Sequence, residues 1–104
     1  MEAPNSWMAI ETLKDILRAN KPNRVIIDEI QPIIGNRTQT VVLEPSITIP
    51  IQNPFFATML INGSFETGDK YYEYITLFTL GAGFNFDKNQ VVVTSNKTTL
   101  TIIY

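Results

Sequence analysis

The acidic and aromatic side chains between residues 66 and 74 are the part of this sequence best equipped for chemistry. Glu66, Asp69 and Glu73 occur among tyrosines there, and a pair of carboxylates performs most glycoside hydrolysis. Their spacing is not specific for that reaction, and the chain contains no histidine, the commonest general base. No serine stands in the Gly-x-Ser-x-Gly context of a nucleophile elbow. The sequence therefore predicts that the protein is not an enzyme.

The residue types that usually hold metals and cofactors are also missing. The chain has no cysteine and no histidine, which removes the commonest transition-metal ligands. The stretch ETGDK at residues 66–70 offers oxygen ligands but lacks the alternating acids of a calcium loop. The stretch GAGFNF at residues 81–86 is glycine-rich, but no predicted helix follows it, as a phosphate site would need. We expect no metal site and no cofactor.

The charges and the start of the chain exclude further classes of function. Eight basic residues are scattered among ten acidic ones, giving a net charge of -2, whereas a nucleic-acid-binding protein normally shows a basic stripe. The first twenty residues contain no apolar core of a signal peptide, and no run approaches the length of a membrane span. We expect no nucleic-acid partner, no membrane partner and no secretion through a signal peptide.

A mainly β fold must position these side chains. The chain of 104 residues has the size of a single domain, residues 1–104, with a helix at 6–20 and a β-domain at 24–104. From residue 24 onward, β-branched and aromatic runs alternate with turn residues every eight to twelve positions. This pattern predicts an antiparallel β-sandwich or barrel of seven to eight short strands with one N-terminal amphipathic helix.

The N-terminal helix needs a surface to pack on. Ser6, or Asn5 after Pro4, is the expected N-cap, and residues 20–22 are expected to end the helix. Its apolar stripe consists of Trp7, Ile10, Leu13 and Leu17. Such a short helix is marginal alone in water, so the stripe is expected to pack on the sheet of the same chain, with packing between subunits as the alternative.

The strand predicted at residues 70–80, KYYEYITLFTL, is apolar on both faces. Alternation separates Tyr71, Glu73, Ile75, Leu77 and Thr79 from Tyr72, Tyr74, Thr76, Phe78 and Leu80. An ordinary sandwich strand has one solvated, polar face. We assign the face of Ile75 and Leu77 to the core, so that the face of Tyr72, Tyr74 and Phe78 needs a second cover. That cover is the helix, another protein subunit or a bound carbohydrate.

Three prolines mark a different kind of strand. Pro45, Pro50 and Pro54 lie within ten residues, and proline is confined to sheet edges, strand starts and bulges because it cannot donate a backbone hydrogen bond. We expect this segment to be an edge strand, or an arm that lies across a neighbouring subunit.

These observations favour a non-catalytic structural subunit of a larger assembly, either a homo-oligomer or a protein attached to a larger particle. The assembly that fits best is the virion of a tailed bacteriophage, with a role in capsid decoration, head-to-tail joining or tail-fibre attachment, and a location in the virion or in the host cytoplasm during assembly. The predicted interface residues are Trp7, Ile10, Leu13, Leu17, Tyr72, Tyr74, Phe78, Ile103 and Tyr104.

Two alternatives remain at this point. The first is a carbohydrate- or ligand-binding β-module in which Tyr71, Tyr72 and Tyr74 stack on sugars beside Glu73 and Asp69. A glycan is the less favoured partner because nothing in the spacing of these residues is specific for one. The second is a small bacterial regulatory or inhibitor domain, which would be monomeric when free.

Overall fold

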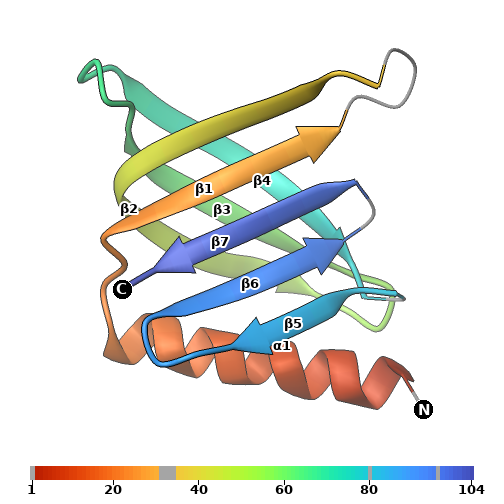
Figure 1. The fold of residues 1–104 in the computed structure, drawn as a ribbon. Coiled ribbons are helices and arrows are strands. Elements are labelled where there is room, and N and C mark those ends of the chain that lie inside the picture. The colour runs from red at the N-terminus through yellow and green to blue at the C-terminus, as the bar shows by residue number, and fades with distance from the viewer. Residues whose placement is uncertain (1, 31–34, 80, 96) are drawn as a thin grey trace.

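Seven antiparallel strands and one helix make up the fold (Figure 1). The computed structural model describes residues 2–30, 35–79, 81–95 and 97–104. The elements are α1 (Glu2–Ala19), β1 (Arg24–Ile30), β2 (Arg37–Gln52), β3 (Phe56–Ser64), β4 (Lys70–Phe78), β5 (Gly83–Phe86), β6 (Gln90–Ser95) and β7 (Thr98–Ile103). The strands form a single sheet in the order β4-β3-β2-β1-β7-β6-β5. The predicted mainly β, antiparallel fold with one N-terminal helix is confirmed.

The helix begins earlier than the sequence indicated. It starts at Glu2, so Asn5 and Ser6 lie inside it and the predicted N-cap is wrong. Pro4 does not prevent this earlier start, because the first four N–H groups of a helix have no intrahelical acceptor and a proline there forfeits nothing. The predicted end is confirmed, since α1 stops at Ala19 and the Asn20 N–H donates to the Ile16 carbonyl at 2.9 Å.

Strand β2 runs through both halves of the molecule. Its first part pairs with β1, from Ile30 opposite Arg37 to Arg24 opposite Leu43. From Leu43 onward it pairs with β3 instead, and the register shifts between Leu43 and Ser46. At this point Glu44 takes a positive φ of 46°, a conformation that non-glycine residues rarely adopt. The strand therefore bends where it changes partners.

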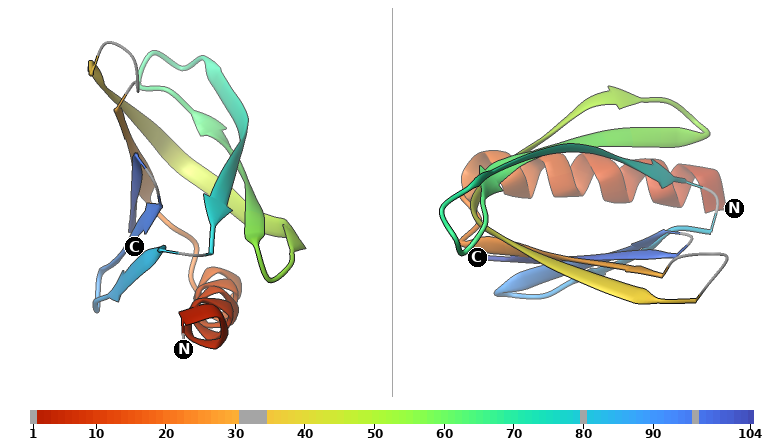
Figure 2. Two further views of the ribbon diagram at one scale, coloured as in Figure 1. Left: turned by 90° about the vertical axis from the view of Figure 1, so that its right-hand side faces the viewer. Right: turned by 90° about the horizontal axis from the view of Figure 1, so that it is seen from above.

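The bend folds the single sheet into two facing layers. One layer contains β5, β6, β7, β1 and the first part of β2, and the other contains the second part of β2 with β3 and β4. In Figure 2 (left) the layers diverge towards α1, which lies across the open end between them. The arrangement resembles a sandwich, but it is built from one sheet that does not close into a barrel.

The core fills the space between the two layers and the helix. The strands other than β5 contribute buried residues from one alternating face, as a period of two requires. The buried apolar residues are Ile10, Leu13, Val25, Ile27, Val42, Ile47, Ile49, Ala57, Met59, Ile61, Leu77, Val91, Val93, Leu100 and Ile102. Helix α1 completes this core from the open end, which confirms that its stripe packs on the sheet of its own chain.

The end of β4 is tied to the opposite layer by hydrogen bonds. The Phe78 N–H donates to the Ser95 hydroxyl of β6 at 2.9 Å, and that hydroxyl lies 3.4 Å from the Phe78 carbonyl. The Thr79 hydroxyl donates to the Pro54 carbonyl at 2.6 Å. Ser95 and Thr79 are both buried, and buried polar groups are stable only when such bonds satisfy them.

Gly63 allows β3 to pass close to the bend in β2. A Cβ atom at this position would lie 2.6 Å from Val42 Cγ1 and 2.8 Å from the Leu43 carbonyl oxygen. We predict that Gly63→Ala lowers the free energy of unfolding by about 1–3 kcal/mol, because overpacking forces the strands apart. Urea unfolding followed by circular dichroism measures this change.

Gly83→Ala is the matched control, since Gly83 also lies in a strand. A Cβ atom there would meet only Thr94 Cβ, at 4.0 Å. We expect a change of no more than about 0.5 kcal/mol. Equal losses in the two variants would contradict the role given to Gly63.

Candidate functional site

Strand β4 separates its side chains as the alternation predicted. Leu77 is only 1% exposed, and Tyr71 and Ile75 are partly buried against the core. Tyr72, Tyr74 and Phe78 point the other way and are 56%, 58% and 51% exposed. The assignment of Ile75 and Leu77 to the core is confirmed. Helix α1 lies on the inner side of the sheet with Ile10 and Leu13 in the core, so it cannot cover the exposed rings.

These rings belong to a larger apolar surface that extends onto β3. In the β3–β4 register, Tyr74 stands opposite Leu60 and Phe78 stands opposite Phe56, and opposed residues of an antiparallel pair point to the same face. Leu60 and Phe56 are themselves only partly buried. We call Tyr72, Tyr74, Phe78, Phe56 and Leu60 the outer aromatic face.

The outer aromatic face lies beside an open sheet edge. Strand β4 is at one end of the strand order and pairs with β3 in an unbroken register over all nine of its residues. Strand β5, at the other end, has only four residues. Natural proteins usually shorten, kink or charge their edges to prevent further pairing. Strand β5 is short, as expected of a protected edge, whereas β4 is long and regular.

The tyrosines do not assemble into one sugar platform. Tyr71 packs on the inner side with its ring in edge contact with Phe65, the centroids 5.4 Å apart. Tyr72 and Tyr74 meet edge to face on the outer side, 6.1 Å apart. The three tyrosines therefore do not form one surface on which a sugar could stack, because successive residues of a strand point to opposite faces.

Tyr71 borders an open hollow of about 440 Å³, which the carboxylates Glu29 and Glu73 also line. The residues lining the hollow are Glu29, Thr40, Phe65, Lys70, Tyr71, Tyr72 and Glu73. Burial, helped by the negative charges of Glu73 and Glu29, raises the pKa of Tyr71 to about 12. Two further acids proposed from the sequence, Glu66 and Asp69, are exposed, and the Asp69 carboxylate accepts a hydrogen bond from Thr67 at 3.1 Å.

The other predicted interface residues have different surroundings. Ile10 and Leu13 are 0% exposed in the core of their own chain, so naming them as interface residues was wrong. The cause is that α1 enters the space between the layers instead of lying on the outside. Trp7 is 39% exposed and Leu17 is partly buried.

The two residues at the end of the chain are partly buried. Ile103 stands opposite Arg24 and Gln90 on the outer side of its layer, away from the outer aromatic face. Tyr104 packs against the core, where its buried hydroxyl has no hydrogen-bond partner among the residues that the structure describes. Burial raises the pKa of Tyr104.

A feature that the sequence analysis missed lies between α1 and β2. An open hollow of about 610 Å³ is lined by Lys14, Leu17, Arg18, Lys21, Pro22, Pro45, Ser46, Ile47, Thr48 and Ile49. We call it the cationic groove, because its charged lining residues are all basic. The i, i+4 spacing of Lys14 and Arg18 was a readable signal for one helical face, and Lys21 follows shortly after α1 ends at Ala19. The sequence could not show that β2 lies opposite them.

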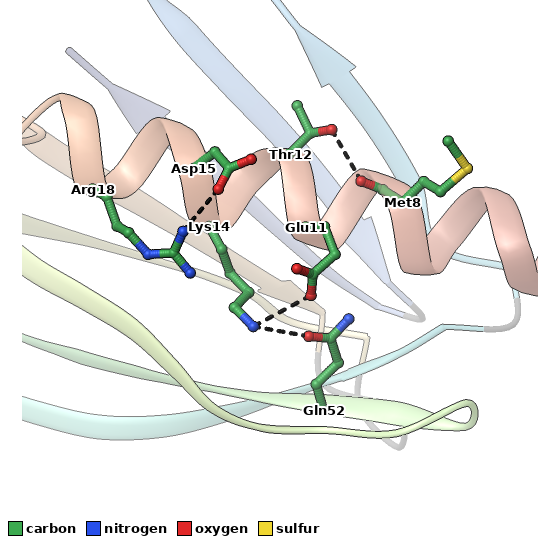
Figure 3. Close-up of polar contacts among 7 residues, drawn as sticks. All are labelled: Met8, Glu11, Thr12, Lys14, Asp15, Arg18 and Gln52. Atoms are coloured by element: carbon green, nitrogen blue, oxygen red, sulfur yellow. Dashed lines mark hydrogen bonds and ion pairs between the residues drawn. The ribbon is translucent and has the colours of Figure 1, made fainter.

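Side-chain contacts hold two of these cations in place (Figure 3). Lys14 Nζ lies 3.3 Å from Glu11 Oε2 and 3.2 Å from Gln52 Oε1 at the end of β2. Arg18 pairs with Asp15 at 2.8 Å, with both side chains largely exposed. Exposed ion pairs of this kind contribute only about 0.2–1 kcal/mol to stability. Arg18 can therefore leave Asp15 for another carboxylate at a small cost in free energy.

Among residues 2–30, 35–79, 81–95 and 97–104, no group of three or more acidic, histidine or cysteine side chains is placed to hold a metal ion. The helix that the structure describes is not long and apolar enough to cross a membrane. No protein-family model, no curated protein and no solved structure matches this chain.

The raised pKa of Tyr71 leads to a prediction at alkaline pH. The unfolded chain releases this proton near pH 10 and the folded chain near pH 12. Between these values the native state binds more protons, so the free energy of unfolding falls as pH rises. We predict that Tyr71→Phe makes this fall smaller and removes the last-titrating component of tyrosinate absorbance.

Tyr74→Phe is the control, because it removes a hydroxyl from the opposite face of the same strand. The last-titrating component of tyrosinate absorbance should persist in this variant. Its persistence in Tyr71→Phe would contradict the surroundings assigned to Tyr71.

Proposed function

We propose that this protein is a non-catalytic structural subunit that joins a larger protein assembly through the outer aromatic face and the open edge of β4. The single observation that supports this proposal is the exposure of Tyr72, Tyr74 and Phe78 by more than half, on a nine-residue edge strand. Aromatic residues are enriched at protein interfaces, and contiguous exposed apolar patches on a folded chain mark interaction sites.

The face and the edge would act together in binding. As far as Leu77, the backbone groups on the open edge of β4 can form a strand ladder with a partner, as in other cases of strand addition, whereas those of Phe78 already bond to Ser95. Beside that ladder the rings would supply apolar contact area, and the tyrosine hydroxyls suit a rim that stays partly wet. The partner is a second copy of the chain or a protein of the particle to which the chain attaches.

The more specific proposal is a virion component of a tailed bacteriophage, acting in capsid decoration, head-to-tail joining or tail-fibre attachment. The support is compositional: a small β-rich chain without cysteine or histidine. Under this proposal the protein is found in the virion, and in the host cytoplasm during assembly.

The carbohydrate-binding alternative has less support from the geometry. A stacking platform needs rings that share one face, and Tyr71 lies on the other face from Tyr72 and Tyr74. The remaining pair meets edge to face at 87°, so the two rings do not lie in one plane for a sugar to cover.

Two substitutions test the β4 interface. We predict that Tyr74→Lys with Phe78→Lys abolishes self-association, because two charges would have to be desolvated on binding. Stability of the monomer should change by no more than about 0.5 kcal/mol per site, since both side chains are exposed. Sedimentation velocity over a concentration series measures the association, and urea unfolding measures the stability.

Asn85→Lys with Thr94→Lys is the matched control, because it adds the same charge to exposed positions of β5 and β6 at the other end of the sheet. This variant should associate as the wild type does. Wild-type chain that stays monomeric throughout would count against a second copy as the partner, and association that survives the β4 substitutions would count against the proposed interface.

A further inference from the structure

We infer that the cationic groove is a second binding site, which takes an extended acidic peptide as an added strand along β2. This site lies apart from the outer aromatic face and serves a different partner. Three observations support it: an unpaired strand edge, a row of cations with no carboxylate in the described lining, and a hollow of suitable size.

The first observation is that β2 has a free edge along the groove. Strand β1 pairs with β2 only as far as Leu43, and the last backbone contact on that side is the Glu44 N–H donating to the Asn23 carbonyl at 2.8 Å. Beyond it, residues 45–52 have only β3 as a neighbour among the described strands. An edge of this kind can accept a peptide in the manner of strand addition, in which main-chain hydrogen bonds supply affinity.

The prolines of β2 are consistent with this edge. Pro45 and Pro50 lie in the half of β2 that lacks a strand on one side, where a missing N–H is tolerated. The sequence-based prediction of an edge at these prolines is therefore confirmed for this half. Unlike the prolines, the lining residues Ser46 and Thr48 have backbone N–H groups that can donate hydrogen bonds.

The second observation is the charge of the lining. Lys14, Arg18 and Lys21 line the groove, and no acidic residue is among the lining residues that the structure describes. Lys21 makes no ion pair with any described residue. Lys14 and Arg18 are paired with Glu11 and Asp15, which lie outside the described lining. The positive charges of the lining, with that of Lys21 unpaired among the described residues, select an anionic partner over a cationic one.

The spacing of the cations matches an extended chain. Lys14 and Arg18 are separated by a rise of about 6 Å along α1, and Lys21 follows two residues after α1 ends at Ala19. Alternate side chains of a strand lie about 7 Å apart, and the long, flexible arms of lysine and arginine can absorb that difference. Acidic side chains at every second position would therefore face α1, and the intervening side chains would face solvent.

The third observation is the size and the floor of the groove. Its volume of about 610 Å³ lies within the range of about 300–1,000 Å³ that ligand sites occupy. Leu17, Ile47 and Ile49 contribute apolar surface to it, which suits the backbone and aliphatic parts of a peptide better than a small, fully hydrated anion. The structure thus favours an acidic peptide over an inorganic ion.

The test uses the intact chain and a synthetic probe. The probe is an acetylated and amidated peptide of four Glu-Thr repeats carrying a fluorophore, and the matched probe replaces each Glu with Lys. We predict saturable binding of the acidic peptide by fluorescence anisotropy, weakening as salt is added, and no binding of the basic one. On the isotope-labelled chain, amide NMR shifts should change at Ser46 and Thr48 and stay unchanged at Tyr72 and Tyr74.

Variants in which positive side chains are replaced by neutral ones locate the site. Arg18→Gln with Lys21→Gln should weaken binding by roughly tenfold or more, a change of about 1.4 kcal/mol or more in binding free energy. Lys88→Gln with Lys97→Gln is the control, because it removes the same charge from exposed positions outside the groove. Equal weakening in the two variants would overturn the assignment, and so would NMR shifts confined to β4.

Backbone methylation tests the added strand. One peptide is N-methylated at every threonine and another at every glutamate. Only alternate N–H groups of a strand face its neighbour, so one of these peptides should lose binding and the other should keep it. Equal binding of both would mean a site for anions in general, and no binding of the unmethylated acidic peptide would mean no peptide site. Either result overturns the inference.

Discussion

The bend in β2 at Glu44 is the constraint on which the rest of the structure depends. A flat sheet of seven strands would leave one apolar face without a partner, since the described part of the chain has only one helix to cover it. By changing partners from β1 to β3 at Leu43, β2 folds the sheet against itself, and the two layers cover each other's inner faces. The positive φ at Glu44 and the absence of a side chain at Gly63 let the strands approach at this point.

The same bend creates both candidate binding surfaces. Because β2 leaves β1 at the bend, its second half has one unpaired edge, and α1 lies opposite that edge with its cations. Because β3 and β4 follow β2 into the second layer, β4 becomes the outer strand of that layer with a bare face and a bare edge. A regular sandwich of two separate sheets would have no strand shared between layers and so no comparable groove.

The two surfaces differ in what they can recognise. The outer aromatic face offers rings and a regular strand edge, where affinity would arise from buried apolar area and strand pairing. The cationic groove offers charge and a short strand edge, where selection would depend on the sign of the partner's charges and on salt. They are built from different elements, so binding at one does not require the other to be filled.

The sequence alone determined the features that depend on local pattern. Alternation placed Ile75 and Leu77 in the core and Tyr72, Tyr74 and Phe78 on the opposite face, and the run of β-branched segments gave a mainly β fold with one helix. The period of a strand or helix is fixed by its own backbone, which explains this success.

Tertiary structure decided everything that depends on which elements meet. The sequence could not show that α1 buries Ile10 and Leu13 in the core, that no described element covers Tyr72 and Tyr74, or that residues 45–49 line a groove with Lys14, Arg18 and Lys21. Each of these depends on the place where β2 bends, and a bend of that kind is set by the packing of distant strands against each other, because local propensity alone disfavours a positive φ at a glutamate.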